Sequence, residues 1–189
     1  MNGMNVTALS DRQLLARLVG EHAAGRYYQG SLKPLFADSG NHVHRKCAAA
    51  RELVRRYLGE EMQCRCVLSA PGTVRDFLRI HFANQEHESF IALWLDAQNR
   101  LIAAEELFRG TLTQTSVYPR EVVKAALRAN AGAVIFSHNH PSGVAEPSRA
   151  DELLTGNLKQ ALALVDVKIL DHFVVAGSAT ISFAERGLL

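Results

Sequence analysis

The chain has 189 residues, of which 48% are hydrophobic and 21% are charged. This is the composition of a globular protein, and the length allows one sizeable core or one core with a small appendage. A formal net charge of +2 is too small to indicate a polyanionic partner for the whole chain. No apolar segment approaches the roughly 20 residues of a membrane-spanning helix, and the first ten residues do not resemble a signal peptide. We therefore expect a soluble, cytoplasmic protein without a membrane partner.

The first 68 residues are expected to form a small helical segment. Ser10 can cap a helix that ends near Gly20. A second helix is predicted over 44–58, and Gly59 is its stop signal. The apolar content of residues 1–68 is modest, so we expect the stability of this segment to depend on contacts with the rest of the chain.

Basic residues outnumber acidic ones in this helical segment. Residues 1–68 contain ten Lys and Arg against six Asp and Glu, whereas residues 69–189 contain eleven against thirteen. A solvated helix face is the ordinary explanation of such an excess, and contact with nucleic acid is the alternative. Weak nucleic-acid contact through the N-terminal segment therefore stays open.

Residues 69–189 alternate between helical and strand patterns. Helices are predicted over 73–81, 119–130 and 148–164. Strands are predicted over 90–95, 101–108, 133–137, 169–176 and 180–183. The first two strands form a hairpin, and the continuous apolar run of the first indicates a strand covered on both faces. The pattern predicts a mixed sheet flanked by helices, an α/β or α+β layered domain.

The most informative stretch is a His-x-His sequence that seven residues separate from Ser-x-x-Asp. His138 and His140 stand at the end of a buried strand, where residues two apart point to the same side. Ser148 opens a helix that presents Asp151 in its first turn. Two imidazoles and one carboxylate suit zinc and leave the fourth tetrahedral position for water. The pattern predicts one catalytic Zn²⁺ per chain.

Hydrolysis of an amide at such a site also needs a base that is not itself a metal ligand. The upstream candidates are Glu86, Glu88, Glu105 and Glu106. Glu88 comes immediately before the apolar strand 90–95, which we expect beside the histidine strand, so we favour Glu88. The hydroxyl of Ser148 is the available donor for the oxyanion of the tetrahedral intermediate.

Each of these features also has a structural explanation. The two histidines can be ordinary residues at a strand end, and Ser148 with Asp151 resembles a helix-capping pair. These explanations must also account for Pro141 and for the order of the elements, and we therefore favour the metal site. Ser148 can serve in both capacities. His172 is interpreted as a structural residue paired with a nearby polar group.

The His-x-His and Ser-x-x-Asp pattern resembles the JAMM motif of the JAB/MPN-domain metalloproteases. More closely, six stretches are similar to the bacterial RadC family, also called the UPF0758 group. They are Arg109-Gly110-Thr111-Leu112, Pro119-Arg120-Glu121-Val122, His138-Asn139-His140-Pro141-Ser142-Gly143, Pro147-Ser148-Arg149-Ala150-Asp151, Leu170-Asp171-His172 and Ser182-Phe183-Ala184-Glu185-Arg186-Gly187.

The resemblance implies a cytidine-deaminase-like α/β layered fold and a zinc-dependent metallopeptidase or isopeptidase acting on a peptide or protein substrate. It implies zinc held by His138, His140 and Asp151, with Glu88 at the position of the general base and Ser148 at that of the assisting serine. Asn139 is the RadC-type residue between the two histidines.

RadC proteins also carry a DNA-repair label, and their full chains tend to begin with a helix-hairpin-helix module. Residues 37–42 lack the Gly-apolar-Gly turn of that module, so the N-terminal segment is at most a degenerate version of it. A DNA-associated accessory protein with a structural or vestigial metal site is the alternative function, and a scaffold that uses the fold for protein contacts is a third.

Overall fold

The computed structural model describes residues 6–37, 40–110 and 117–189. Asp38 and Ser39, together with Thr111 and Leu112 of the first RadC-like stretch, lie outside the described residues. Contacts between Cα atoms divide the chain into two compact units, Met1–Arg56 and Tyr57–Leu189, which we call the N-terminal and C-terminal units.

The division falls inside helix α3 (His42–Cys64), earlier than the boundary expected after residue 68. The reason lies in the last turns of that helix. Met62 is 2% exposed and Leu58 is partly buried, and both pack into the core of the C-terminal unit. The end of α3 therefore belongs with the sheet.

The N-terminal unit is helical, as predicted. It contains the 3-10 helices η1 (Val6–Ala8) and η2 (Lys33–Phe36), the helices α1 (Asp11–Val19) and α2 (Glu21–Tyr27), and the start of α3. Ser10 caps α1 through a capping box with Gln13, and Gly20 ends it with φ of +93°. A small core of seven buried residues joins α1, α2, η2 and the start of α3: Leu15, Ala16, Ala23, Ala24, Leu35, Val43 and Cys47.

Helix α3 is longer than the predicted 44–58. It begins at His42 because the side-chain oxygen of Asn41 accepts hydrogen bonds from the backbone amides of Val43 and His44. The prediction that Gly59 ends the helix was wrong. A Cβ atom at Gly59 would stand 3.7 Å from the ring of Phe77, so packing against α4 (Pro71–Phe82) continues past the glycine.

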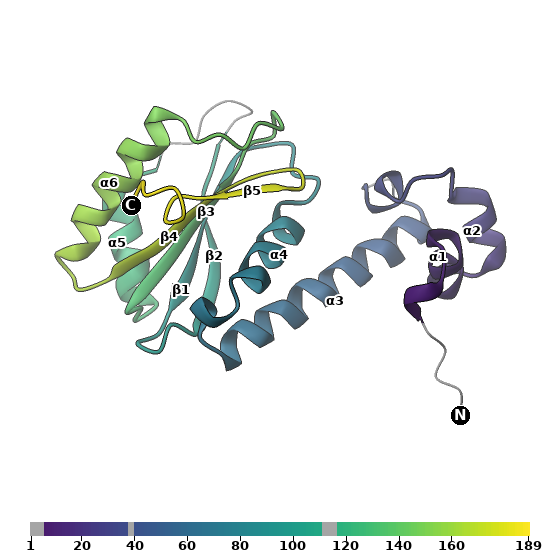
Figure 1. Cartoon of the computed structure of the whole chain (residues 1–189), viewed down its shortest axis with the longest axis horizontal. Coiled ribbons are helices and arrows are strands. Elements are labelled where there is room, and N and C mark those ends of the chain that lie inside the picture. Colours follow the sequence, from purple (N-terminus) through teal and green to yellow (C-terminus); the bar gives the residue numbers. More distant parts are fainter. Residues whose placement is uncertain (1–5, 38–39, 111–116) are drawn as a thin grey trace. The chain divides into compact units, whose positions relative to one another are not determined.

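Five strands of the described residues form one sheet in the order β2-β1-β3-β4-β5 (Figure 1). They are β1 (Ser89–Leu95), β2 (Leu101–Arg109), β3 (Ala133–Asn139), β4 (Lys168–Ala176) and β5 (Ala179–Ser182). Strands β3 and β4 are parallel, and the other neighbouring pairs are antiparallel. The sheet is mixed, which confirms the predicted α/β layered class, and β1 lies beside the histidine strand as expected.

Helices cover both faces of the sheet (Figure 1). Helix α4 (Pro71–Phe82) packs on one face with the alternate β1 residues Ile91 and Leu93. Helices α5 (Pro119–Arg128) and α6 (Arg149–Ala163) pack on the other face with Phe90 and Trp94. Every residue of β1 is buried, as its continuous apolar run predicts. The 3-10 helix η3 (Val67–Ser69) precedes α4.

Three chain segments meet at one end of the central strands. They are the carboxyl end of β3, the start of β1 and the first turn of α6. This convergence brings the predicted site residues together. None of the helices within the described ranges combines the length and the apolarity needed to cross a membrane.

Candidate metal centre

The end of β3 presents two imidazoles to the same space. His138 is 1% exposed and its ring stacks over Phe90 of the neighbouring strand. The amide of His140 donates to the carbonyl of Val175 at 2.8 Å, which continues the pairing with β4 past the end of β3. The Nε2 atoms of His138 and His140 are consequently 3.0 Å apart.

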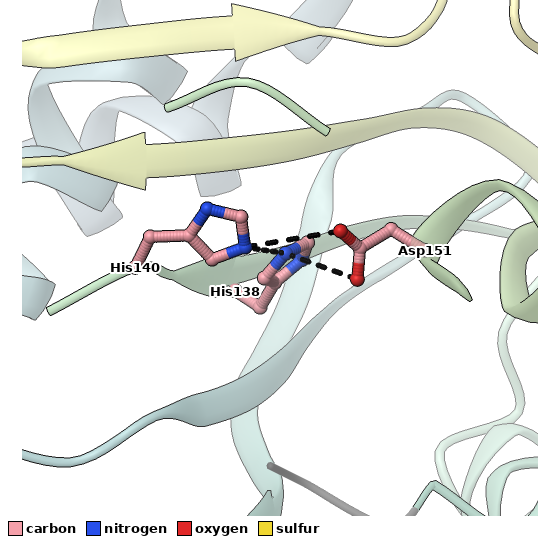
Figure 2. A group of neighbouring side chains, drawn as sticks. All are labelled: His138, His140 and Asp151. Atoms are coloured by element: carbon pink, nitrogen blue, oxygen red, sulfur yellow. Dashed lines mark hydrogen bonds and ion pairs between the residues drawn. The ribbon is translucent and has the colours of Figure 1, made fainter. Parts of the chain in front are cut away.

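The first turn of α6 brings a carboxylate to these imidazoles. Ser148 caps the helix: its hydroxyl accepts from the amide of Asp151, and its own amide donates to the Asp151 carboxylate at 2.7 Å. The carboxylate oxygens then lie 3.5 Å from His138 Nε2 and 3.8 Å from His140 Nε2. Figure 2 shows the three side chains facing one another.

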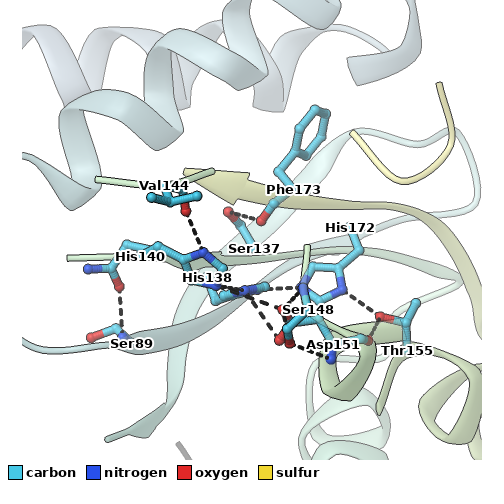
Figure 3. A network of polar contacts seen from close by, with 11 residues as sticks. Ser89, Ser137, His138, His140, Val144, Ser148, Asp151, Thr155, His172 and Phe173 are labelled. Atoms are coloured by element: carbon cyan, nitrogen blue, oxygen red, sulfur yellow. Dashed lines mark hydrogen bonds and ion pairs between the residues drawn. The ribbon is translucent and has the colours of Figure 1, made fainter. Parts of the chain in front are cut away.

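The hydrogen bonds of the rings indicate which nitrogen of each carries a proton. His140 Nδ1 lies 2.7 Å from the carbonyl oxygen of Val144 (Figure 3). A carbonyl oxygen only accepts, so Nδ1 carries the proton and donates it. In the neutral ring, the Nε2 atom of His140 then carries a lone pair directed at Asp151 and His138.

A longer chain of hydrogen bonds makes the same assignment for His138 (Figure 3). The hydroxyl of Thr155 donates to the backbone carbonyl of Asp151 at 2.6 Å, so it accepts from His172 Nδ1, also at 2.6 Å. Complete burial lowers the pKa of His172 well below the usual imidazole value, so this ring is neutral. Its Nε2 therefore accepts from His138 Nδ1 at 2.8 Å. In the neutral His138 ring, Nε2 therefore carries the lone pair.

The centre is thus a convergence of hydrogen-bond acceptors. Two imidazole lone pairs and a carboxylate repel one another unless a cation or a proton lies among them. Their separations of 3.0, 3.5 and 3.8 Å are close to the edge of about 3.4 Å that a zinc tetrahedron with bonds of 2.0–2.1 Å requires. His138, His140 and Asp151 were the one group with metal-ligand geometry found among the described residues. The donor set fits zinc.

Asp151 is held in its ionised form. Burial of its carboxyl group opposes ionisation, but in the metal-free protein a hydrogen bond and positive charge from the protonated His138 ring, together with the hydrogen bonds from Ser148, outweigh burial and hold its pKa well below the usual range. A deprotonated carboxylate is the form that binds a metal ion.

Glu88, the favoured base, stands next to this cluster. It is half-buried immediately before β1, and it interacts electrostatically with His138, His140 and Asp151. Burial raises its pKa, and the nearby histidines oppose that rise. A carboxylate with a raised pKa beside a metal site has the properties of a general base.

The other candidate glutamates are engaged elsewhere or exposed. Glu105 accepts from the indole of Trp94 at 2.9 Å and pairs with an arginine of α5. Glu106 accepts from the hydroxyl of Ser89 at 3.1 Å. Glu86 is exposed in the segment that leads to β1. The carboxyl group of Glu88 is electrostatically coupled to the His-His-Asp cluster.

Ser148 directs its hydroxyl at Asp151 as well as capping α6. The Oγ–H donates to the carboxylate at 2.6 Å, and the residue is exposed. An exposed hydroxyl at the edge of the cluster can also turn towards a substrate. The structure therefore shows Ser148 as the cap of α6 and as a hydrogen-bond donor to Asp151. Its predicted role at an oxyanion stays a prediction.

Two residues support the centre in a way that the sequence patterns did not predict. Thr155 fixes the ring of His172, and Asn139 contacts the chain on both sides of Glu88. Thr155 lies one turn of α6 after Asp151, so its helical spacing was a usable signal. His172 was expected to pair with a polar group, and it contacts both Thr155 and a predicted metal ligand.

Comparison with known proteins places the chain in a family. The sequence-family model of the RadC-like JAB domain matches residues 68–188, which are more than half of the sequence. The chain belongs to the RadC family. RadC proteins are part of the JAB superfamily, and membership is compatible with metal-dependent hydrolysis at a His-His-Asp cluster.

Several RadC relatives are similar over most of this chain. A UPF0758 protein of Dechloromonas aromatica (strain RCB) is 60% identical over 181 residues, which are 94% of this chain and 79% of that protein. A UPF0758 protein of Nitrosomonas eutropha is 62% identical over 141 residues, 75% of this chain and 63% of that protein. A third, from Methylibium petroleiphilum, is 58% identical over 160 residues. The chain spans less than two thirds of the Nitrosomonas relative, and these names state no activity.

Proposed function

We propose that this RadC protein is a zinc-dependent hydrolase that cleaves amide bonds, either as a peptidase or as an isopeptidase. The observation that carries the proposal is the convergence of three acceptors with metal-ligand spacing beside a half-buried carboxyl group. Acceptors in this arrangement are stabilised by a divalent cation, and the neighbouring glutamate provides a base that is not one of the three ligands.

His138, His140 and Asp151 would hold the zinc ion. When bound, zinc supplies a Lewis acid that makes a water molecule nucleophilic near neutral pH. Glu88 takes the proton of the attacking water and returns it to the leaving amine, for which its raised pKa suits it. The hydroxyl of Ser148 turns from Asp151 to donate to the oxyanion that develops on the substrate carbonyl.

The alternative, a DNA-associated accessory function, rests on the basic excess of residues 1–68. Arg55 and Arg56 contribute to that excess, yet both pair with Glu52 at 2.8 and 2.9 Å. This pairing reduces the positive charge that α3 offers to phosphates. Affinity for duplex DNA that falls steeply as salt rises is the result that would favour the alternative.

A peptide-library cleavage assay tests the proposal. Wild type and the variants Glu88→Gln and His138→Ala are compared, with zinc content measured for each and held equal between wild type and Glu88→Gln. Cleavage by wild type that falls at least 100-fold in Glu88→Gln supports the function. Zinc far below one ion per chain in wild type, or equal cleavage by all three proteins, would refute it.

A further inference from the structure

Asn139 stands between the two histidines but turns away from them. Successive side chains of a strand point to opposite sides, so the side chain of Asn139 leaves β3 on the face opposite His138 and His140. It is 4% exposed. Its Oδ1 atom accepts from the amide of Ser89 at 2.8 Å, and its Nδ2 donates to the carbonyl of His87 at 2.9 Å.

These two backbone groups lie on either side of Glu88. A third contact holds Glu88 itself, because its carbonyl oxygen accepts from the amide of Gly110 at 2.8 Å. Residues 85–88 belong to no helix or strand, so no regular pattern of backbone hydrogen bonds fixes them. The contacts with Asn139 and Gly110 tie the backbone on both sides of Glu88 to the ends of β3 and β2.

From this geometry we infer that Asn139 is a positioning residue that fixes the carboxyl group of Glu88 over the metal centre, an inference that rests on the proposed function. The end of β3 then serves both metal binding and proton transfer: His138 and His140 face the cation, and Asn139 between them positions the general base Glu88.

The chemistry of the amide group suits Asn139 to this task. The bridge needs one acceptor for an N–H and one donor for a C=O, and asparagine carries both on a short side chain. Serine at this position is too short to span both groups. An ionised aspartate would keep the bond to Ser89 but would set a negative charge against the carbonyl of His87. Alanine would leave both backbone groups buried without these partners.

The experiment compares Asn139→Ala with Ser137→Ala in the full chain. Ser137 is a matched control because its buried hydroxyl also leaves β3 on the face opposite the histidines, but it bonds the carbonyl of Phe173 in β4. Three properties are measured: the zinc dissociation constant, the hydrogen-exchange rate of the Ser89 amide, and the pseudocontact shift of the Glu88 carboxyl carbon in Co²⁺-loaded protein. The resonance of the Glu88 carboxyl carbon is assigned by its disappearance from the spectrum of the Glu88→Gln variant.

In Asn139→Ala, we expect faster exchange at Ser89 and a reduced, averaged shift at Glu88, with zinc affinity within about threefold of wild type. Turnover of a cleaved peptide should fall by about 10- to 100-fold with little change in KM, because misplacement of a catalytic group by about 1 Å has this effect. Ser137→Ala should keep the wild-type shift and turnover.

The outcomes separate this inference from the proposed function. If Asn139→Ala keeps the Glu88 shift and the turnover of Ser137→Ala, Asn139 does not position the base. If Asn139→Ala loses zinc affinity much more than Ser137→Ala, its role is support of the ligands instead. If wild type cleaves no peptide while the shift still depends on Asn139, the positioning role stands and the hydrolase function fails.

Discussion

His172 accepts a hydrogen bond from His138 Nδ1 at 2.8 Å, and this contact decides which nitrogen of His138 faces Asp151. The tautomer of His172 depends in turn on the hydroxyl of Thr155, which accepts a hydrogen bond from His172 Nδ1. A buried neutral ring thereby orients a proposed metal ligand across two parallel strands. Partners of this kind hold the ligand ring and raise its basicity.

Replacement of His172 should therefore weaken metal binding without removal of a ligand. His172→Phe keeps the packing in the core but leaves His138 Nδ1 without its acceptor. We expect zinc affinity to fall by about 10- to 100-fold, measured by competition with a chromophoric chelator. Thr155→Val should show a smaller loss of the same kind. The exposed His22→Ala is the control, and a loss as large in His22→Ala as in His172→Phe would contradict the prediction.

Ser148→Ala should reduce both stability and zinc affinity. Loss of the cap of α6 is expected to lower the free energy of unfolding by about 1 kcal/mol, and the Asp151 carboxylate loses a donor that orients it. Ser10→Ala is a matched control, because Ser10 forms the same kind of capping box at α1. Urea unfolding and zinc titration measure the two effects. Equal zinc affinity in the two variants would show that Ser148 does not orient Asp151.

Glu88→Gln should stabilise the metal-free protein at neutral pH. Because burial raises the pKa of Glu88, its protonated form favours the folded state. Protonated Glu88 contributes its full stabilisation of the folded protein at pH values below the pKa of the unfolded chain, near 4.3. This stabilisation is lost as the pH rises through the higher pKa of Glu88 in the folded protein. The variant should thus exceed wild type in the free energy of unfolding at pH 7 by more than at pH 4. The exposed Glu60→Gln controls for the loss of one charge. A variant less stable than wild type at pH 7 would contradict the assignment.

Zinc should raise the melting temperature of the wild-type protein and not that of Asp151→Asn. A ligand that binds only the folded state adds about 2.7 kcal/mol at a free concentration 100 times its Kd. Asparagine keeps the size of the side chain but loses the charge that the cation needs. Differential scanning calorimetry with and without zinc, after treatment with a chelator, measures the gain. The same gain in both proteins would place the ion elsewhere.

The sequence predicted the framework of the site well, since that framework depends on local patterns. The apolar run 90–95 indicated a central strand, and the capping signal of Ser148 located the start of α6. The spacing of His138 and His140 predicted that both rings face one side. Each of these inferences uses residues close together in the chain, where strand and helix periodicity act directly.

The rest could not be read from local patterns. The contact of His138 with His172 depends on the register of β3 and β4, which lie side by side although 34 residues separate these histidines. The bond between Asn139 and Ser89 depends in the same way on the pairing of β3 with β1. The end of α3 was mispredicted because its packing against Phe77 overrode the local signal of Gly59.

Strand β3 carries two kinds of side chain on alternate sides, so its residue count decides which of them faces the proposed metal site. Insertion or deletion of a single residue before His138 would rotate both imidazoles to the α4 side and turn Asn139 towards the proposed metal site. No change in the side chains could compensate, because the two histidines and Asn139 would exchange sides of the sheet at the same time. We therefore expect RadC sequences to tolerate insertions at the β1–β2 turn or after β4, and to keep the count between Ala133 and His140 constant.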